Sequence, residues 1–164
     1  MSTSAPEPAG PAPAEGAKAE EIFERAAERA GAQDLEYAGA VTPEEAWRLY
    51  AAKAAKLIDV RTRPEWEFVG HVPGVPLIEW RSYGAERPNA EFVQELEKVA
   101  ARDEPVLFLC RSGVRSHHAA DLAARAGYRR AYNVLEGFEG DLDPERHRGL
   151  AGGWRHAGLP WTQT

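Results

Sequence analysis

The sequence predicts an α/β fold in which a parallel sheet is flanked by helices on both faces. Short apolar runs of strand type alternate along the chain with longer segments of helical periodicity. One run, residues 106–109, is apolar at every position, as expected of a strand buried on both faces. Strands separated by helical crossovers pair in parallel, so we expect ligands at their carboxyl ends.

The first 34 residues are predicted to form a flexible tail that ends in a short helix. Residues 1–17 are mostly Ala, Pro, Glu, Gly and Ser, which bury too little apolar surface to offset the entropy of ordering. Residues 18–30 place Ile22 and Phe23 on one apolar face, and Gly31 is predicted to end the helix. Because isolated helices are marginal, this one either frays or docks on the domain or on a partner. The domain itself is predicted to span residues 35–164.

The elements of this domain follow in order. A brief strand is predicted over residues 35–37. Thr42 and Glu45 then have the spacing of a capping box, with Pro43 at the first helical position, which predicts a helix over residues 43–53. The other predicted strands are residues 57–60, 75–78, 106–109 and 131–135. The other predicted helices are residues 64–69, 89–101 and 115–126, the last ended by Gly127.

Cys110 is the only cysteine of the chain and directly follows the apolar run 106–109. The turn after it leads into a helix, whose N-terminal N–H groups and dipole favour an anion. Arg111 and Arg115 add positive charge, so we expect the nucleophilic thiolate to be populated near neutral pH. The alternative is a small buried side chain without chemistry, since unpaired cysteines are often buried.

Several motifs in a fixed order resemble those of the rhodanese-like sulfurtransferases, specifically the single-domain type. The motifs are Asp59-Val60-Arg61, Glu65, Gly70-His71-Val72-Pro73-Gly74, the loop from Cys110 to Arg115, and Gly158-Leu159-Pro160. Together they span about residues 41–161. The resemblance implies a single rhodanese-like domain that acts as an enzyme, with Cys110 as its catalytic residue.

The residues around Cys110 are assigned supporting roles. Asp59 follows a buried strand and is expected to orient Arg61, Arg115 or loop N–H groups rather than carry a proton. Gly113 is expected to give the loop its backbone freedom. The predicted substrate-binding residues are Arg111, Ser112, Gly113, Val114 and Arg115, and the predicted supporting residues are Asp59 and Arg61.

The reaction that the resemblance implies is a two-step exchange. Cys110 attacks the outer sulfur of a donor such as thiosulfate, keeps that sulfur as a persulfide, and passes it to an acceptor such as cyanide or a thiol. Because there is no second cysteine, the acceptor must be another molecule, either small or a protein. No cofactor and no metal are expected, since the adjacent His117 and His118 make a poor chelate. The physiological donor and acceptor and the oligomeric state stay open.

Two other functional classes stay open. The first is a non-catalytic binding or regulatory module, which the presence of Cys110 with Arg115 disfavours. The second is a phosphatase or arsenate reductase. In relatives of that kind the arginine comes six residues after the cysteine, whereas Arg115 comes five after Cys110 and Ser116 takes the sixth position. The smaller ring suits a single terminal sulfur atom.

Composition limits the partners and the location. A formal net charge of −6 and a pI near 5.4 argue against a nucleic-acid surface. No apolar run approaches the roughly 18 residues of a membrane span, and no basic segment precedes an apolar run at the N-terminus. With a single cysteine, which fits a reducing compartment, the chain is predicted to be cytoplasmic.

Residues 139–150 depart from the family pattern and look like an insertion. Their position after the last predicted strand suggests a rim or lid over the Cys110 pocket, the alternative being a solvated surface loop. Among the tryptophans, Trp80 is the one expected to line that pocket. The charged and titratable residues of the segment include Asp141, Asp143, Glu145, Arg146, His147 and Arg148.

Overall fold

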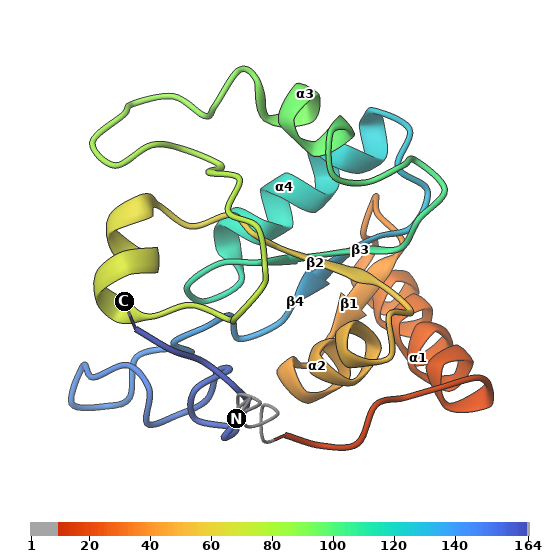
Figure 1. Ribbon diagram of the computed structural model, residues 1–164, viewed down its shortest axis with the longest axis horizontal. Helices are drawn as coiled ribbons and strands as arrows, with labels where there is room; N and C mark the ends of the chain where they lie inside the picture. Colours follow the sequence, from red (N-terminus) through yellow and green to blue (C-terminus); the bar gives the residue numbers. More distant parts are fainter. Residues whose placement is uncertain (1–9, 164) are drawn as a thin grey trace, which may run out of the picture.

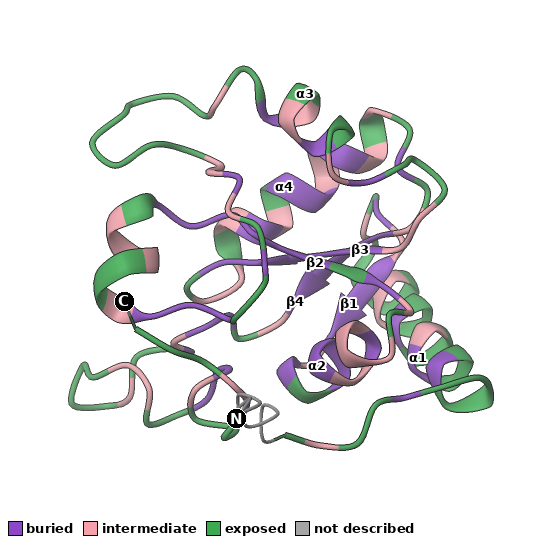
Figure 2. Ribbon diagram, in the orientation of Figure 1, coloured by how far each residue is buried: buried purple, intermediate pink, exposed green. Residues whose placement is uncertain are grey.

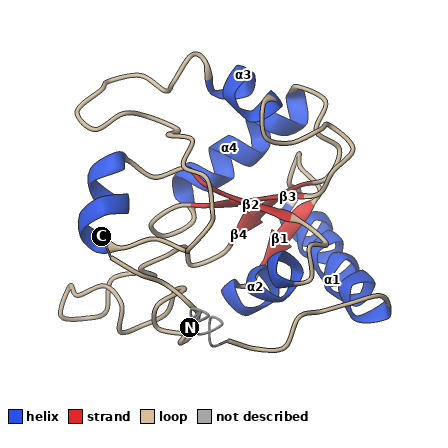
Figure 3. Cartoon of the chain, viewed as in Figure 1, coloured by secondary structure: helices blue, strands red, loops and turns tan. Residues whose placement is uncertain are grey.

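The computed structural model describes residues 10–163, and its centre is one sheet of four parallel strands. The strands are β1 (Gly39–Val41), β2 (Lys56–Asp59), β3 (Val106–Leu109) and β4 (Ala131–Val134), in the order β1-β4-β3-β2 (Figure 3). The register pairs Leu57 with Leu107 and Leu107 with Tyr132. The predicted fold class, a parallel sheet of α/β type, is confirmed.

Helices cover both faces of the sheet (Figure 1). Helices α1 (Ala17–Gln33) and α2 (Pro43–Ala51) cover one face, and α3 (Phe92–Glu97) and α4 (Val114–Arg125) cover the other. Alternate strand residues enter the two cores, since Leu107 lies in the cluster of α1 and α2 whereas Phe108 lies in that of α3 and α4. All four residues of β3 are buried, as its continuous apolar sequence predicts (Figure 2).

The helix that follows β1 shows how local sequence fixes an element. The Thr42 hydroxyl accepts from the Glu45 amide, and the Glu45 carboxylate accepts from the Thr42 amide, which completes the predicted capping box. Pro43 occupies the first turn, where its missing N–H costs nothing. Trp47 and Leu49 are then carried into the core beneath β1 and β2.

Four predicted elements were wrong in extent or kind. Helix α1 continues through Gly31 to Gln33 and ends where Asp34 adopts a left-handed conformation (φ 52°), so the first strand starts at residue 39 rather than 35. Residues 75–78 form no strand, because only Leu77 bridges β2, and prolines at 73 and 76 lack N–H donors. The helix predicted over residues 89–101 is regular only at Phe92–Glu97, after which tighter turns follow.

Helix α1 lies against the domain. Its Ile22 and Ala26 are buried in the same core as Trp47. The preceding residues 10–16 lie alongside α2, where the Trp47 indole donates to the Pro11 carbonyl at 3.0 Å. The rest of the predicted tail, residues 1–9, lies outside the described residues, and the division of the chain at residue 34 stays a prediction. Among the helices of residues 10–163, none is both long and apolar enough to cross a membrane.

Candidate active site

The loop from Cys110 to Gly113 joins the carboxyl end of β3 to the start of α4. Gly113 has φ +104°, in the left-handed region that other residues rarely adopt, and it immediately precedes the helix. This conformation turns the Gly113 amide toward the thiol, so that it donates to Cys110 Sγ at 3.1 Å. The sequence-predicted curl around Cys110 is therefore present, with one N–H group directed at the sulfur.

The Cys110 thiol lies beneath the loop with 1% of the residue exposed, and it contacts a buried polar network. Ser116 Oγ lies 3.2 Å from Sγ and 2.5 Å from Asn133 Oδ1, and Asn133 Nδ2 donates to the Gly113 carbonyl at 3.1 Å. Since that carbonyl can only accept, the Asn133 amide orientation is fixed and Ser116 must donate to Oδ1. Ser116 therefore presents a lone pair to Cys110 Sγ, so that in any hydrogen bond between the two groups the sulfur would be the donor.

Arg115 is fixed by Glu65 across the loop. The guanidinium donates to the two carboxylate oxygens at 2.7 and 2.9 Å, and Thr62 donates to the same carboxylate from its amide and its hydroxyl. Although desolvation opposes ionisation, the Arg115 and Thr62 hydrogen bonds lower the pKa of Glu65 to about 2. Burial tends to lower the pKa of Arg115, but its hydrogen bonds to Glu65 raise it overall. Arg115 thus ties α4 to the π-helix η1 (Glu65–Val69).

Asp59 and Arg61 form a second, deeper pair. Arg61 is fully buried, and its side chain donates to both Asp59 oxygens, the shortest contact being 2.7 Å. The same guanidinium donates to the Gly70 carbonyl at 2.7 Å and lies 4.2 Å from the centre of the Phe138 ring. Of the three partners considered for Asp59 from sequence, the structure selects Arg61. The pair links β2 to the end of η1 and to the segment after β4.

The segment after β4 straps the active-site loop from the other side. The amides of Phe138 and Glu139 donate to the carbonyls of Cys110 and Arg111 at 2.8 and 2.9 Å. Gly137 comes so close that a Cβ there would overlap the Arg111 carbonyl, and its φ is +65°. A side chain at this position would therefore displace the loop that carries Cys110.

Sequence reasoning did not find these contacts of the loop. Glu65 and Ser116 were named from the sequence, but not as partners of Arg115 and Cys110. The one available signal was Asn133, a polar residue inside the otherwise apolar β4. Hydrogen-bonding groups at such a position need a buried partner. No sequence pattern pairs residues 50 positions apart, as Glu65 and Arg115 are.

A cleft of about 700 Å³ opens above the loop. Two predicted substrate-binding residues, Arg111 and Arg115, line it, whereas Cys110, Ser112, Gly113 and Val114 are not among the lining residues. Glu139 and Arg148 also line it, so the segment 139–150 contributes to the rim of the cleft. The other lining residues come from the segment 62–69 and from the loop 81–85.

The tryptophan and histidines singled out from sequence have other partners. Trp80 packs edge-on against Phe92 and stacks on His118 instead of lining the cleft. His117 Nδ1 lies 2.6 Å from the Tyr37 hydroxyl. His71 stacks on Trp66, with its Nδ1 3.1 Å from the carbonyl of that tryptophan. All three histidines thus have packing or hydrogen-bonding roles around the site.

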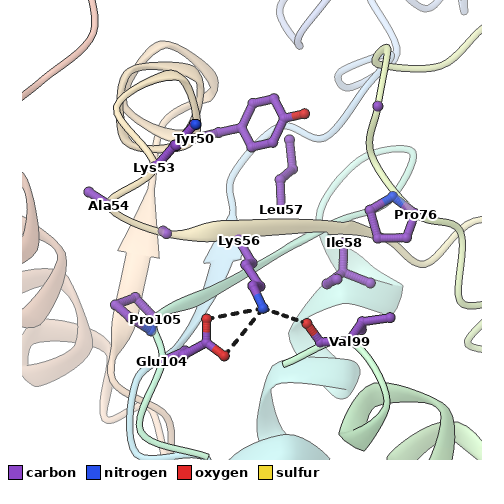
Figure 4. Close-up of a pocket in the computed structure, with 12 residues that line it drawn as sticks. Tyr50, Lys53, Ala54, Lys56, Leu57, Ile58, Pro76, Val99, Glu104 and Pro105 are labelled. Atoms are coloured by element: carbon purple, nitrogen blue, oxygen red, sulfur yellow. Dashed lines mark hydrogen bonds and ion pairs between the residues drawn. The ribbon is translucent and has the colours of Figure 1, made fainter. Parts of the chain in front are cut away.

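A second cavity, of about 440 Å³, lies at the start of β2 (Figure 4). Tyr50, Leu57 and Pro76 face it, and Lys56 at its edge contacts Glu104 and the Val99 carbonyl. It lies at the amino end of β2, whereas Cys110 follows the carboxyl end of β3. Since Arg111 and Arg115 of the Cys110 loop line the first cleft and no residue of that loop lines this cavity, the first cleft is the better candidate for chemistry.

Comparison with known proteins identifies the family. A model described as "Rhodanese-like domain" matches residues 42–142, well over half of the chain. The chain belongs to the rhodanese-like family. The resemblance predicted from the motifs is confirmed, and the match contains Asp59, Arg61 and the Cys110 loop. It ends at residue 142, inside the segment 139–150 that departs from the family pattern.

Individual rhodanese-like relatives differ in what is known of them. The chain is 35% identical over 109 residues to the uncharacterised protein RP600 of Rickettsia prowazekii, covering 65% of this chain and 82% of that protein. It is 30% identical over 120 residues to the thiosulfate sulfurtransferase GlpE of Actinobacillus succinogenes, covering 73% and 86%. The crystal structure of Rv0390 from M. tuberculosis superposes with a TM-score of 0.70 at 47% identity, covering 78% and 99%.

Proposed function

We propose that this rhodanese-like protein is a sulfurtransferase. It would move a sulfane sulfur from a donor such as thiosulfate to a thiophilic acceptor, cyanide or a thiol, through a persulfide on Cys110. The observation that carries the proposal is the Gly113 amide, which donates to Cys110 Sγ at the head of α4. The similarity to GlpE supports the same reaction class.

The first step is an attack of the Cys110 thiolate on the outer sulfur of the donor. With thiosulfate, a bond forms between Sγ and that sulfur, the sulfur–sulfur bond of the donor breaks, and its electron pair leaves with sulfite. The thiol proton, which is directed at Ser116, must be lost before or during the attack. The Gly113 N–H then stabilises the anionic sulfur, since an amide at the head of a helix favours negative charge.

The second step transfers the sulfur out of the enzyme. An acceptor thiolate attacks the outer sulfur of the persulfide, a new sulfur–sulfur bond forms on the acceptor, and the electron pair of the broken bond returns to Cys110. Exposed Arg111 is the side chain proposed to attract anionic reactants, because Arg115 is already engaged by Glu65. No metal or cofactor takes part in either step.

Intact-mass analysis tests this function. After mixing with thiosulfate, the wild-type chain should gain the mass of one sulfur atom, and added cyanide should remove it as thiocyanate. Cys110→Ser should gain nothing. A wild-type chain that never gains sulfur from thiosulfate, a thiol persulfide or a protein persulfide would instead favour a binding module. Cys110-dependent turnover of an aryl phosphate would favour a phosphatase.

The location also stays a proposal. A single cysteine, used as a reactive thiol, is best preserved in a reducing compartment, which supports the cytoplasm. Fractionation of cells that produce the chain, with a thiol-state readout of Cys110, would test it.

A further inference from the structure

Exposed apolar side chains occur on the segments that line the cleft. Among the described residues, six large apolar side chains are exposed, and five belong to segments that line the cleft or directly adjoin its lining. Figure 1 shows these segments, which are η1, the loop after residue 80, the start of α4 and the loop after β4, on the same side of the molecule. The five residues are Phe68, Tyr83, Val114, Leu142 and Leu150. Exposed apolar side chains on several segments around one cleft favour interaction with another molecule.

The same rim is positively charged on an acidic protein. Four arginines and two glutamates line the cleft, which gives a formal excess of two positive charges on a chain of net charge −6. Arg115 is neutralised by Glu65, whereas Arg81 and Arg111 are exposed and make no ion pair with any residue that the structure describes. These two guanidinium groups are therefore available to a negatively charged partner.

The position of the thiol restricts what can receive its sulfur. Cys110 is 1% exposed, and its loop neighbours Arg111 and Arg115 line the cleft of about 700 Å³, so an acceptor thiol that approaches through this cleft must enter on a narrow group. A small thiol could enter but would leave Tyr83, which lines the cleft and is exposed, without a contact. A peptide segment can place its cysteine inside the cleft while its neighbouring residues cover the rim.

We propose that the rim is a docking surface for an acidic, cysteine-bearing segment of a partner protein that accepts sulfur from Cys110. This rests on the proposed function and names its acceptor. In the transfer, the thiolate of the segment attacks the outer sulfur of the Cys110 persulfide. The segment leaves as a persulfide, and Cys110 returns as a thiolate, so no further oxidant or reductant is needed. Carboxylates beside that cysteine pair with Arg81 and Arg111, and apolar residues further out cover Tyr83 and Leu150.

Synthetic peptides of equal length test the transfer of sulfur from Cys110 to an acceptor thiol. Protein already loaded with sulfur is mixed with a peptide that has glutamates on both sides of one cysteine and a leucine beyond them, or with its lysine counterpart, or with glutathione. The acidic peptide should be the fastest acceptor, by about tenfold over the lysine peptide at low salt, and the advantage should shrink at high salt. Equal rates for the two peptides would overturn the proposal.

Two rim variants and one distant control locate the surface. On loaded protein, Arg81→Ala and Tyr83→Ala should each slow transfer to the acidic peptide by about three- to tenfold. Arg129→Ala removes an exposed arginine outside the cleft and should leave transfer unchanged. If all three variants behave alike, the rim is not the docking surface.

Binding separates this proposal from the failure of sulfur transfer itself. The acidic peptide with serine in place of its cysteine should bind to the Cys110→Ser protein, and the binding should weaken in Arg81→Ala and Tyr83→Ala by the same factors. This measurement needs no sulfur chemistry. Peptide binding without persulfide formation would contradict the proposed function and support the docking surface. Persulfide formation without peptide binding would support the proposed function and contradict the docking surface.

Discussion

The floor and the rim of the cleft are built in opposite ways. At the floor, Cys110, Ser116 and Asn133 are buried, and each polar group has a partner within the chain. At the rim, Arg81 and Arg111 are exposed and have no ion pair among the described residues. Chemistry at the sulfur thus depends on bonds that the fold itself supplies, whereas the ion-pair partners of Arg81 and Arg111 would have to come from another molecule. Variants of the floor should alter stability and reactivity, and variants of the rim should alter partner choice.

The largest effect is expected for Asp59→Ala, below the floor. The variant leaves the fully buried Arg61 guanidinium without its carboxylate, and an unpaired buried charge costs about 3–5 kcal/mol. Urea-induced unfolding, followed by tryptophan fluorescence, measures the loss. Arg111→Ala at the rim is the matched control, with a change within about 0.5 kcal/mol. A similar small change in Asp59→Ala would contradict the assigned role of the pair.

The next effect concerns Glu65 and has a defined pH range. Its pKa is about 2 in the folded chain, below the ordinary value of 4.5 for a glutamate, so its ionised form stabilises the fold above about pH 4.5. This stabilisation, at most about 3 kcal/mol, is lost as the pH falls from 4.5 toward 2. Glu65→Gln should therefore be less stable than wild type at pH 7, and the two should converge in acid. Unfolding free energies measured at several pH values test this, and a constant difference across the range would refute it.

The comparison also separates what the sequence could predict from what it could not. The position of Cys110 after β3 and the turn at Gly113 follow from local patterns, an apolar run and a glycine before a helix. The capping box at Thr42 is equally local. These features were predicted because each depends on residues a few positions apart. The structure changed only the ends of most elements, where tertiary contacts decide the last turn.

The contacts that hold the floor are different in kind. Arg115 meets Glu65, and Ser116 meets Asn133, only after the strands have assembled. The segment 75–78 was mistaken for a strand because its apolar residues fit the pattern, although Pro76 within it and Pro73 before it restrict pairing to one bridge. The length of α1 was missed because Gly31 usually ends helices, yet packing on the sheet carries the helix past it.

The direction of the hydrogen bond between Cys110 and Ser116 can be tested by removing the Asn133 acceptor of the Ser116 hydroxyl. In Asn133→Val the Ser116 hydroxyl loses its acceptor and can donate to the sulfur, which favours the thiolate. Alkylation of Cys110 by iodoacetamide at neutral pH should then quicken by about tenfold, equivalent to about 1.4 kcal/mol. Ser116→Ala is the control, because it has no hydroxyl to redirect. An unchanged rate in Asn133→Val would mean that Ser116 already donates to the sulfur.

The smallest effect on sulfur uptake from the donor is expected for a replacement within residues 139–150, the part of the rim that departs from the family pattern. The Gly149 amide donates to the Glu139 carbonyl at 2.7 Å, so the segment between them is closed at its base, and its inner turn is held by bonds between Asp143 and His147. Replacing residues 141–148 with a short Gly-Ser linker should therefore leave the fold intact, because the strap contacts of Phe138 and Glu139 remain.

This replacement removes Leu142 and Arg148 from the rim but nothing from the floor. Sulfur uptake from thiosulfate should stay within about twofold of wild type, because it depends on the buried network around Cys110. Transfer to the acidic peptide should fall further than uptake, since part of the docking surface is lost. Both half-reactions are measured by intact mass on the same preparation. If uptake and transfer fall equally, the segment supports the floor instead, and the separation between floor and rim does not hold.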